Sequence, residues 1–319
     1  MRKYEFKRKS KLIEFFGEKF IMLNAFAALI AILLIFTFIF KESIPIFNDA
    51  EIIEEAGIDK MFFKQQYYEG RDPKFSWQPN SEVPKYTVWP LIIGSLKAAV
   101  VAMLFAVPLG VAAAVYSSQF ASRRLRELIK PVIEMLAGIP SVVLGFFALI
   151  VLATFLQKTL GFTFRLNAVN AGIALGLAVV PIVFTMTEDA LTSVPRSLRD
   201  AALALGANPW QVSRTVVLPA ALPGIAAGIM LGFGRAIGET MIVLMASGNA
   251  AIISANLTDS IRTISATIAA ELAEVVFGSA HYSVLFFLGT MLFVFTFIIN
   301  LGGEYIMHSL KERFQGQTK

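Results

Sequence analysis

Residues 200–219 read DAALALGANPWQVSRTVVLP and form a polar, punctuated segment between two long apolar runs. Pro195 can begin a short helix just before this segment, because its missing N–H is not needed in a first helical turn. Alanine and leucine then favour helix, and Gly206 stands where a helix would end in a left-handed residue. A short helix with its own stop signal predicts a docking element on a loop rather than a plain linker.

The composition around this loop is that of a membrane protein. The chain has 319 residues, of which 56% are hydrophobic and 16% charged, whereas a soluble domain carries about 25% charged residues. Six stretches are long enough to cross a bilayer, which takes about 17–25 residues as helix. We therefore predict an all-α membrane protein with six transmembrane helices. The predicted spans are 20–40, 91–118, 131–157, 169–188, 222–247 and 284–304.

Lysine and arginine are unevenly distributed between the segments that connect these spans. Seventeen of the 28 lie in four segments on one side of a six-span chain: 1–19, 119–130, 187–221 and 305–319. Loops rich in Lys and Arg stay on the cytoplasmic side of a membrane. We therefore expect cytoplasmic termini, a cytoplasmic loop at 189–221, and external segments at 41–90 and 248–283.

Two of the connecting segments carry further signals. The tail 1–19 alternates basic and aromatic residues, which predicts an amphipathic helix in the cytoplasmic interface; a disordered basic tail is the alternative. The segment 41–90 contains five prolines and two tryptophans. Its length suits a small ordered cap over the membrane domain rather than a separate enzyme.

Several function classes lack the residues they need. The chain has no cysteine and two widely separated histidines, so we expect no disulfide, thiolate site or histidine-based metal site. The sequence G-x-x-x-x-G-K-[ST], which cradles nucleotide phosphates, does not occur. The spans hold no pairing of nucleophile and base, so we expect no enzyme. The net charge of +5 fits positive-inside asymmetry better than binding to nucleic acid.

The loop 189–221 resembles a motif of the permease subunits of ATP-binding-cassette importers. That motif reads E-A-A, three residues, G, nine residues, I-x-L-P. Here every spacing is matched, with Asp for Glu and Val for Ile, by Asp200, Ala201, Ala202, Gly206, Val216, Leu218 and Pro219. The resemblance implies the type I importer permease (MetI-like) fold. It also implies that the short helix docks into a cleft of a separate cytoplasmic ATPase, which would hold the ATP and Mg²⁺, with no cofactor on this chain.

Four other stretches are similar to PstC-type permeases of phosphate importers. They are FSWQP (75–79), AVPLGVAAAVYSSQFA (106–121), KPVIEMLAGIPSVVLGFFAL (130–149) and RAIGETM (235–241). The resemblance implies a multi-pass protein of the bacterial inner membrane that forms half of a transmembrane pathway. Its implied partners are a second, related permease, an ATPase dimer, a phosphate-binding protein and membrane lipid. The alternatives are a permease for sulfate or molybdate, or an ion-coupled secondary transporter, which would not need the docking loop.

Arg235 and Glu239 lie inside the apolar span 222–247. A charge at the centre of a bilayer costs from about 2.5 to more than 10 kcal/mol, so such residues face the interior of a helix bundle. On a continuous helix the two charges share one face with glycines that allow close helix packing. These glycines are Gly224, Gly228 and Gly232.

Two interpretations of this charged pair remain open. In the structural one, Arg235 and Glu239 neutralise each other, although acid before base is the better order for a helical pair four residues apart. In the functional one, Arg235 lines the path of an anion, since guanidinium is a planar, bidentate partner for phosphate oxygens. Glu239 then orients Arg235. The resemblance favours the functional interpretation, because phosphate permeases carry these charges in the same stretch.

Three weaker candidates lie in other spans. Lys97 can either extend to the membrane surface or attract anions to an external vestibule. Ser141 follows a proline that can kink the third span, and its hydroxyl could meet an anion or only assist packing. Glu134 is expected to form an interfacial ion pair with Arg126 or Lys130.

Overall fold

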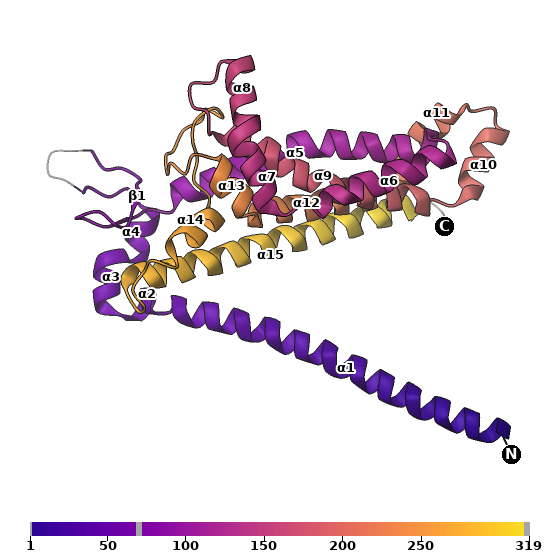
Figure 1. Cartoon of the computed structure of the whole chain (residues 1–319), viewed down its shortest axis with the longest axis horizontal. Helices are drawn as coiled ribbons and strands as arrows, with labels where there is room; N and C mark the ends of the chain where they lie inside the picture. The colour runs from indigo at the N-terminus through magenta and orange to yellow at the C-terminus, as the bar shows by residue number, and fades with distance from the viewer. Residues whose placement is uncertain (1, 68–71, 316–319) are drawn as a thin grey trace.

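The structure of the chain is a computed structural model that describes residues 2–67 and 72–315. Parts of three predicted segments, namely residues 1, 68–71 and 316–319, lie outside the described residues. The membrane helices lie between two opposite ends of the molecule (Figure 1). One end holds α2–α4, β1 and β2, and we call these elements the cap. The other end holds α10, α11 and the C-terminus.

The elements occur in this order along the chain. The first part has α1 (Arg2–Ser43), α2 (Pro45–Asn48), α3 (Ala50–Ala56), α4 (Ile58–Phe62), β1 (Trp77–Gln78), β2 (Lys85–Tyr86), α5 (Trp89–Val115) and α6 (Arg123–Ala137). The middle part has α7 (Ser141–Phe147), α8 (Ala153–Leu160), α9 (Ala168–Ser193), α10 (Arg196–Ala204) and α11 (Pro209–Val212). The last part has α12 (Leu218–Gly238), α13 (Met241–Ala246), α14 (Ile264–Glu271) and α15 (Ala280–Gln315). Short π-helical turns continue α5, α7 and α11 at Tyr116–Phe120, Ala148–Leu152 and Ser213–Val217.

Six helical stretches in the described part of the chain are long and apolar enough to cross a membrane, which confirms the predicted number. They are Glu14–Asn48, Trp89–Phe120, Ser141–Leu160, Ala168–Ser193, Pro209–Gly238 and Ala280–Tyr305. The second, fourth and sixth stretches agree with the predicted spans 91–118, 169–188 and 284–304 to within about five residues. The other three differ more, because helices begin and end at caps and breaks that an apolar window does not detect.

The first helix, α1, runs without interruption for 42 residues. The tail 1–19 was expected to form an amphipathic helix in the cytoplasmic interface; from Arg2 onward it is helical and continuous with the first span. Only the cap-side half of α1 meets the body, where Phe36 packs on Phe293 at 4.7 Å between ring centroids. The remainder diverges from the other helices (Figure 1).

The predicted third span, 131–157, is wrong at its start. Residues 123–137 form a separate amphipathic helix, α6, which includes Pro131 and ends at Gly138. A new helical stretch starts at Ser141 after the extended Pro140 and ends at Gly161, which has φ +69°. This second stretch, α7 and α8, runs steeply across the direction of α5 and α15 (Figure 1). The break is local, because proline cannot continue the hydrogen-bonding pattern of the preceding helix.

The predicted fifth span, 222–247, is also wrong as a single helix. Its helical stretch starts earlier, at Pro209, and α12 ends at Gly238. Glu239 is extended, with φ −67° and ψ 135°, and α13 begins at Met241. The span is therefore broken between its two charged residues.

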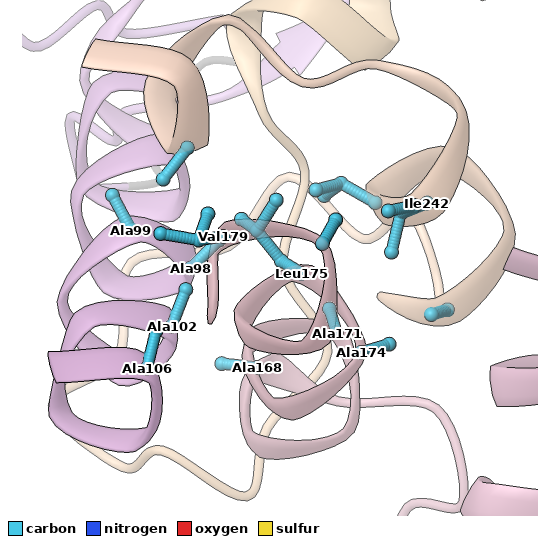
Figure 2. Packing of buried hydrophobic residues seen from close by; sticks show 14 of the residues in the cluster. Ala98, Ala99, Ala102, Ala106, Ala168, Ala171, Ala174, Leu175, Val179 and Ile242 are labelled. Carbon is cyan, nitrogen blue, oxygen red and sulfur yellow. The ribbon is translucent and has the colours of Figure 1, made fainter. Parts of the chain in front are cut away.

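The core of the bundle is made of small side chains where α5 packs against α9 (Figure 2). Alanines from both helices meet there, and Gly172 of α9 lies so close to α5 that a Cβ on it would sit 2.4 Å from Val101 Cγ1. Close approach of small residues is the main source of packing energy between helices in a membrane. The alanines, all at most 5% exposed, are Ala98, Ala99, Ala102, Ala106, Ala168, Ala171, Ala174 and Ala178.

The cap has an apolar core of its own that is continuous with the membrane helices. Ile46, Met61 and Trp77 are buried against Val284 and Leu288 of α15. The strands β1 and β2 pair antiparallel, with Trp77 opposite Tyr86 and Gln78 opposite Lys85. This packing fixes the cap to the start of α15.

Candidate functional site

Arg235 lies in the last turn of α12, three residues before the helix ends. Its side chain is exposed on the isolated chain. Cations are favoured at this position because the carbonyl groups at a helix C-terminus carry partial negative charge. In the described part of the chain, the guanidinium makes no hydrogen bond or ion pair. A permanent charge in an apolar helix is thus left available to a ligand or to another chain.

Glu239 lies in the break rather than on the helix. Its carboxylate accepts a hydrogen bond from the main-chain N–H of Thr240 at 3.2 Å, and its own carbonyl accepts one from Ser265 Oγ at 2.7 Å. Among the described residues it forms no ion pair with Arg235. Pairing on a continuous helix, which both interpretations of the sequence assumed, is therefore absent from this structure.

Three glycines of α12 lie in close contact with α9. A Cβ at Gly224 would lie 2.5 Å from Ala190 Cβ, and one at Gly228 would lie 2.7 Å from Met186 Cβ. Gly232 likewise approaches Val179. All three neighbours belong to α9, so this face of α12 is closed by packing within the chain as far as Gly232. Arg235 follows on the same side of α12, about one turn later, and is exposed.

A cavity of about 490 Å³ opens beside the break. Gly238, Thr240 and Ser265 line it together with apolar residues of α14 and α15. Thr240 Oγ1 donates to the carbonyl oxygen of Gly238 at 3.3 Å. The two hydroxyls thus supply donors to main-chain carbonyls that the end of α12 leaves without helical partners. Neither Thr240 nor Ser265 was among the sequence candidates.

The two weaker candidates of the pathway are held by other elements. Lys97, on α5, donates from Nζ to the main-chain oxygen of Asn256 at 3.1 Å. Ser141 is the first residue of α7 and is half-buried. Within the described residues, no hydrogen bond or ion pair links either side chain to Arg235 or Glu239. The structure therefore brings only Arg235 and Glu239 to the same helix end.

The loop after α9 has the predicted punctuation. Pro195 precedes α10, and Gly206 follows it with φ +87°. The N–H of Gly206 bonds to the carbonyl of Leu203 at 2.9 Å, and that of Ala207 to the carbonyl of Ala202 at 3.1 Å. These two bonds define a Schellman motif, in which a left-handed residue closes the helix.

The short helix α10 presents apolar side chains outward. Leu198 is 46% and Leu203 48% exposed, and none of the residues of α10 is buried. Just after the helix, Leu205 is 90% exposed, and Trp210 of α11 is 58% exposed. Asp200 and Ala201 are exposed on the same helix, whereas Leu218 and Pro219 begin α12. A punctuated helix with exposed leucines has the chemistry of a docking surface.

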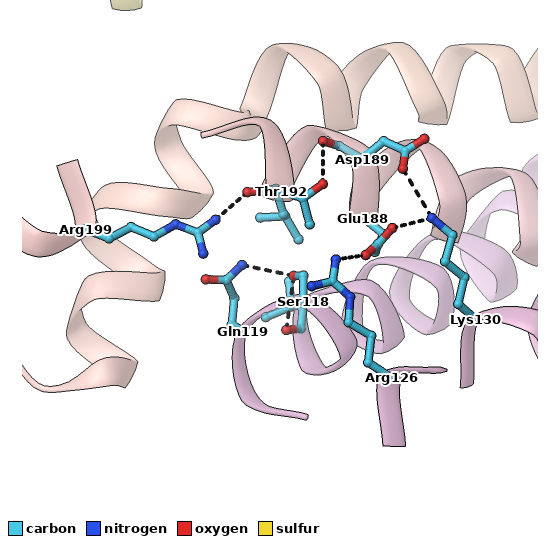
Figure 3. A network of polar contacts seen from close by, with 10 residues as sticks. Ser118, Gln119, Arg126, Lys130, Glu188, Asp189, Thr192 and Arg199 are labelled. Carbon is cyan, nitrogen blue, oxygen red and sulfur yellow. Dashed lines mark hydrogen bonds and ion pairs between the residues drawn. The ribbon is translucent and has the colours of Figure 1, made fainter. Parts of the chain in front are cut away.

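A charged network fixes the end of α9 beside this loop (Figure 3). Glu188 is 1% exposed; it pairs with Arg126 and, at 2.9 Å, with Lys130 Nζ. The expected partner of these cations was Glu134, which forms no ion pair in the described part of the chain. The hydrogen bond to Glu188 raises the pKa of the Lys130 ammonium above its ordinary value, against a smaller opposite effect of burial.

The same network continues into α10. Arg199 Nη2 donates to the carbonyl oxygen of Leu191 at 2.6 Å, so α10 is attached to the last turn of α9 (Figure 3). Glu188 was not predicted, because its partners Arg126 and Lys130 lie about sixty positions earlier, in the segment 119–130 that was expected to be a connecting loop. Its signal in the sequence is the acidic pair Glu188–Asp189 near the end of an apolar span.

The family model described as "Binding-protein-dependent transport system inner membrane component" matches residues 106–312. This range contains the loop motif, the break and Arg235. The chain belongs to this family. It is a permease component of an ABC transporter and a multi-pass protein of the inner membrane.

Named relatives of this permease agree with the family. A phosphate transport system permease protein PstC of Mesorhizobium japonicum is 36% identical over 75% of this chain and 78% of its own length. A probable ABC transporter permease, YqgH of Bacillus subtilis, is 34% identical over 72% and 75%. PstC 1 of Mycobacterium tuberculosis is 34% identical over 69% and 71%.

Two solved ABC transporters share the fold of this permease. A chain of the MetNI methionine transporter, in an inward-facing conformation, has a TM-score of 0.53 and 19% identity, over 70% of this chain and 94% of that chain. A chain of a bacterial alginate transporter, in complex with an alginate-bound periplasmic protein, has a TM-score of 0.57 and 17% identity, over 91% and 94%. The predicted MetI-like importer fold is confirmed.

Proposed function

We propose that this permease is the PstC-like subunit of an ATP-driven phosphate importer and forms half of its transmembrane pathway. The observation that carries the proposal is the exposed guanidinium of Arg235, which has no partner among the described residues and lies at a broken helix inside the membrane domain. The similarity to PstC proteins over about three quarters of the chain supports phosphate as the anion.

The chemistry of Arg235 suits phosphate. A guanidinium keeps its charge at any physiological pH and offers paired N–H groups that match two phosphate oxygens. A lone charge inside a membrane is costly, so Arg235 requires either an anion or residues supplied by another subunit. Glu239 is extended and lies between Gly238 and Thr240, which line the cavity. Its negative charge would keep the empty anion path from being strongly cationic.

A second, PstA-like permease would complete the pathway. Arg235 and the cavity beside Gly238 are open on the isolated chain, and the most apolar 18-residue stretch of the first candidate span has no buried residue. These surfaces fit a membrane partner rather than water. A phosphate-binding protein would deliver the anion at the cap.

Coupling to ATP would occur at the opposite end. The exposed helix α10 and the residues Leu205 and Trp210 form the surface proposed to dock into a separate, PstB-like ATPase dimer, which would hold ATP and Mg²⁺. Because α11 continues directly into α12, a displacement of the docked loop would reach the helix that carries Arg235.

This arrangement requires cytoplasmic termini and an external cap. The natural chain has no cysteine, so single cysteines report position cleanly. Asn80→Cys in the cap and Ser197→Cys in α10 are both at exposed sites. In intact cells an impermeant thiol reagent should label position 80 and not position 197. Labelling of position 197 alone would reverse the proposed orientation.

The substrate is tested by uptake into vesicles that hold the complete complex. Labelled phosphate, sulfate and molybdate are compared with ATP inside or outside the vesicles. We expect ATP-dependent phosphate uptake that Arg235→Lys lowers at least about tenfold, since lysine keeps the charge but loses the planar fork. Arg165→Lys, at an exposed site where the arginine contacts Thr154, is the matched control and should transport normally.

The other outcomes separate the alternatives. Preferential uptake of sulfate or molybdate would assign the permease to another oxyanion. Uptake that follows an ion gradient without ATP would indicate a secondary transporter. Normal uptake by Arg235→Lys would remove Arg235 from the anion path.

A further inference from the structure

Helix α14 connects the cap to the break in α12. It is two turns long, and its residues Ile264, Ser265, Ala266 and Thr267 are buried. At its start, Ser265 Oγ donates to the carbonyl oxygen of Glu239. At its end, Glu271 lies against the cap. One short helix therefore contacts both the broken helix next to Arg235 and the cap.

Glu271 joins three separate segments through one carboxylate. Glu271 is 8% exposed. Trp77 Nε1, from β1 of the cap, donates to Oε1 at 3.1 Å, and Arg262, just before α14, pairs with the same oxygen. His281 Nε2, in the first turn of α15, lies 2.9 Å from Oε2. A carboxylate only accepts hydrogen bonds, so all three neighbours donate to it.

The environment makes this contact specific. Trp77 is 3% exposed and packs edge-on against Tyr86 and His281. A buried carboxylate is stable only where its hydrogen-bond partners are in place. Any displacement of β1 therefore has to move Glu271 or leave a charged group without a partner. The indole N–H and the carboxylate are separated by 194 residues in sequence, so this contact defines how the cap sits on α14.

The start of α14 is also fixed. Ile264 N–H donates to Ser95 Oγ at 3.0 Å, and Arg262 Nε donates to Thr267 Oγ1 at 3.1 Å. Gly94 allows α5 to approach so closely that a Cβ there would sit 2.1 Å from the carbonyl oxygen of Arg262. These contacts hold the start of α14 against α5. Ser265 and Glu271 both belong to this two-turn helix, so no loop separates them.

We propose that Glu271 is a positioning residue through which the cap sets the helix break beside Arg235. A protein that docks on the cap would shift β1, and α14 would pass that shift to the carbonyl of Glu239 through Ser265. The inference rests on the proposed function for the identity of the docking partner, a substrate-binding protein. It assigns the route by which docking would alter the anion path.

The experiment measures ATPase activity of the reconstituted complex with and without the cognate binding protein. Trp77→Phe keeps the aromatic ring and removes only the indole N–H. Ser265→Ala removes only the hydroxyl. The matched control is Trp89→Phe, because Trp89 Nε1, at the start of α5, donates to the carbonyl of Phe62 in the cap and not to Glu271.

We expect Trp77→Phe and Ser265→Ala each to lower the ratio of stimulated to basal ATPase activity by about three- to tenfold, the range for one lost hydrogen bond. Basal activity of Trp77→Phe should stay near wild type. The double variant should show no further loss, because both changes interrupt one route. Trp89→Phe should keep the wild-type ratio.

Losses that multiply in the double variant would show two independent effects and overturn the proposal. An unchanged ratio of stimulated to basal ATPase activity in Ser265→Ala would also overturn it. If Trp77→Phe does not assemble, Ser265→Ala by itself is the test. A basal rate that falls together with the stimulated rate would indicate a purely structural contact. A wild-type complex that no binding protein stimulates would overturn the proposed function as well, whereas a stimulated wild type with unaffected variants overturns this inference alone.

Discussion

The helices α10 and α12 both end next to a glycine, yet different interactions end them. At α10, Gly206 adopts φ +87° and the last carbonyls bond to the two following N–H groups. At α12, Gly238 does not have a positive φ, and the chain turns at the extended Glu239. The carbonyl of Glu239 is satisfied by Ser265, 26 residues away.

The difference separates an end that is encoded locally from one that depends on tertiary contacts. A Schellman motif needs only its own residues, so α10 can keep its shape while it meets another protein. The end of α12 depends on α14 and, through Glu271, on the cap. It can therefore change when the cap moves. We expect substitutions at the two ends to differ accordingly.

The largest effect is expected from Gly206→Val. A β-branched residue at φ +87° is strongly disfavoured, although a Cβ there would have no neighbour within 4 Å. The strain should open the turn after α10 and disturb only the docking surface. We expect the permease to insert normally while ATP-dependent uptake falls at least about tenfold, for a cost of about 1–2 kcal/mol or more.

Gly206→Asn is the control for this prediction. Asparagine tolerates the left-handed region better than other residues with a side chain, so uptake by this variant should stay close to wild type. Equal losses in both variants would mean that the side chain itself, and not the backbone conformation, disturbs docking.

A medium effect is expected from Glu188→Gln. The end of α9 is held by tertiary contacts like that of α12, because Glu188 joins Arg126 and Lys130 of α6. Glutamine keeps the shape but loses the charge. The side chains of Arg126 and Lys130 are 38% and 36% exposed, so water can solvate them. We therefore expect the free energy of unfolding to fall by about 1–3 kcal/mol, less than for a fully buried ion pair.

Thermal unfolding of the purified permease in detergent would measure this loss. Glu127→Gln breaks the ion pair with Arg123. The side chains of Arg123 and Glu127 are 93% and 64% exposed, so this change should leave the unfolding temperature unchanged. If both variants unfold at the wild-type temperature, the network of α6 and α9 contributes little to the fold.

The sequence predicted those parts of the fold that depend on local residues. The six apolar stretches, the start of α10 after Pro195 and the turn at Gly206 follow from composition and from single-residue backbone preferences. The third span was predicted as one helix because the residues on both sides of Pro140 are apolar, and an apolar stretch gives no sign of a break within it. The continuation of α1 into the tail was not predicted, since basic and aromatic residues suit either a collinear helix or one in the interface.

The candidate site was predicted less completely, for the same reason. Arg235 stands out as a charge in an apolar run, and no other residue is needed to notice it. The break at Glu239 is marked in sequence only by the weak helix propensity of Gly238. Ser265 and Glu271 act through contacts with Glu239 and Trp77 that are far apart in sequence. No local pattern indicates such contacts, so only a structure brings them together.

The smallest effect is expected from Gly238→Ala, and it tests the comparison most directly. Gly238 is exposed, and an added Cβ would meet nothing within 4 Å. If glycine alone ended α12, alanine would extend the helix, displace Glu239 and abolish uptake. Because Ser265 holds the carbonyl of Glu239, we expect the break to persist. The free energy of unfolding should rise by at most about 1 kcal/mol, as when alanine replaces glycine in a helix. Uptake should stay within about twofold of wild type, as for an exposed substitution without contacts, and thus above that of Ser265→Ala. An uptake loss in Gly238→Ala as large as that in Ser265→Ala would show that both helix ends are encoded locally.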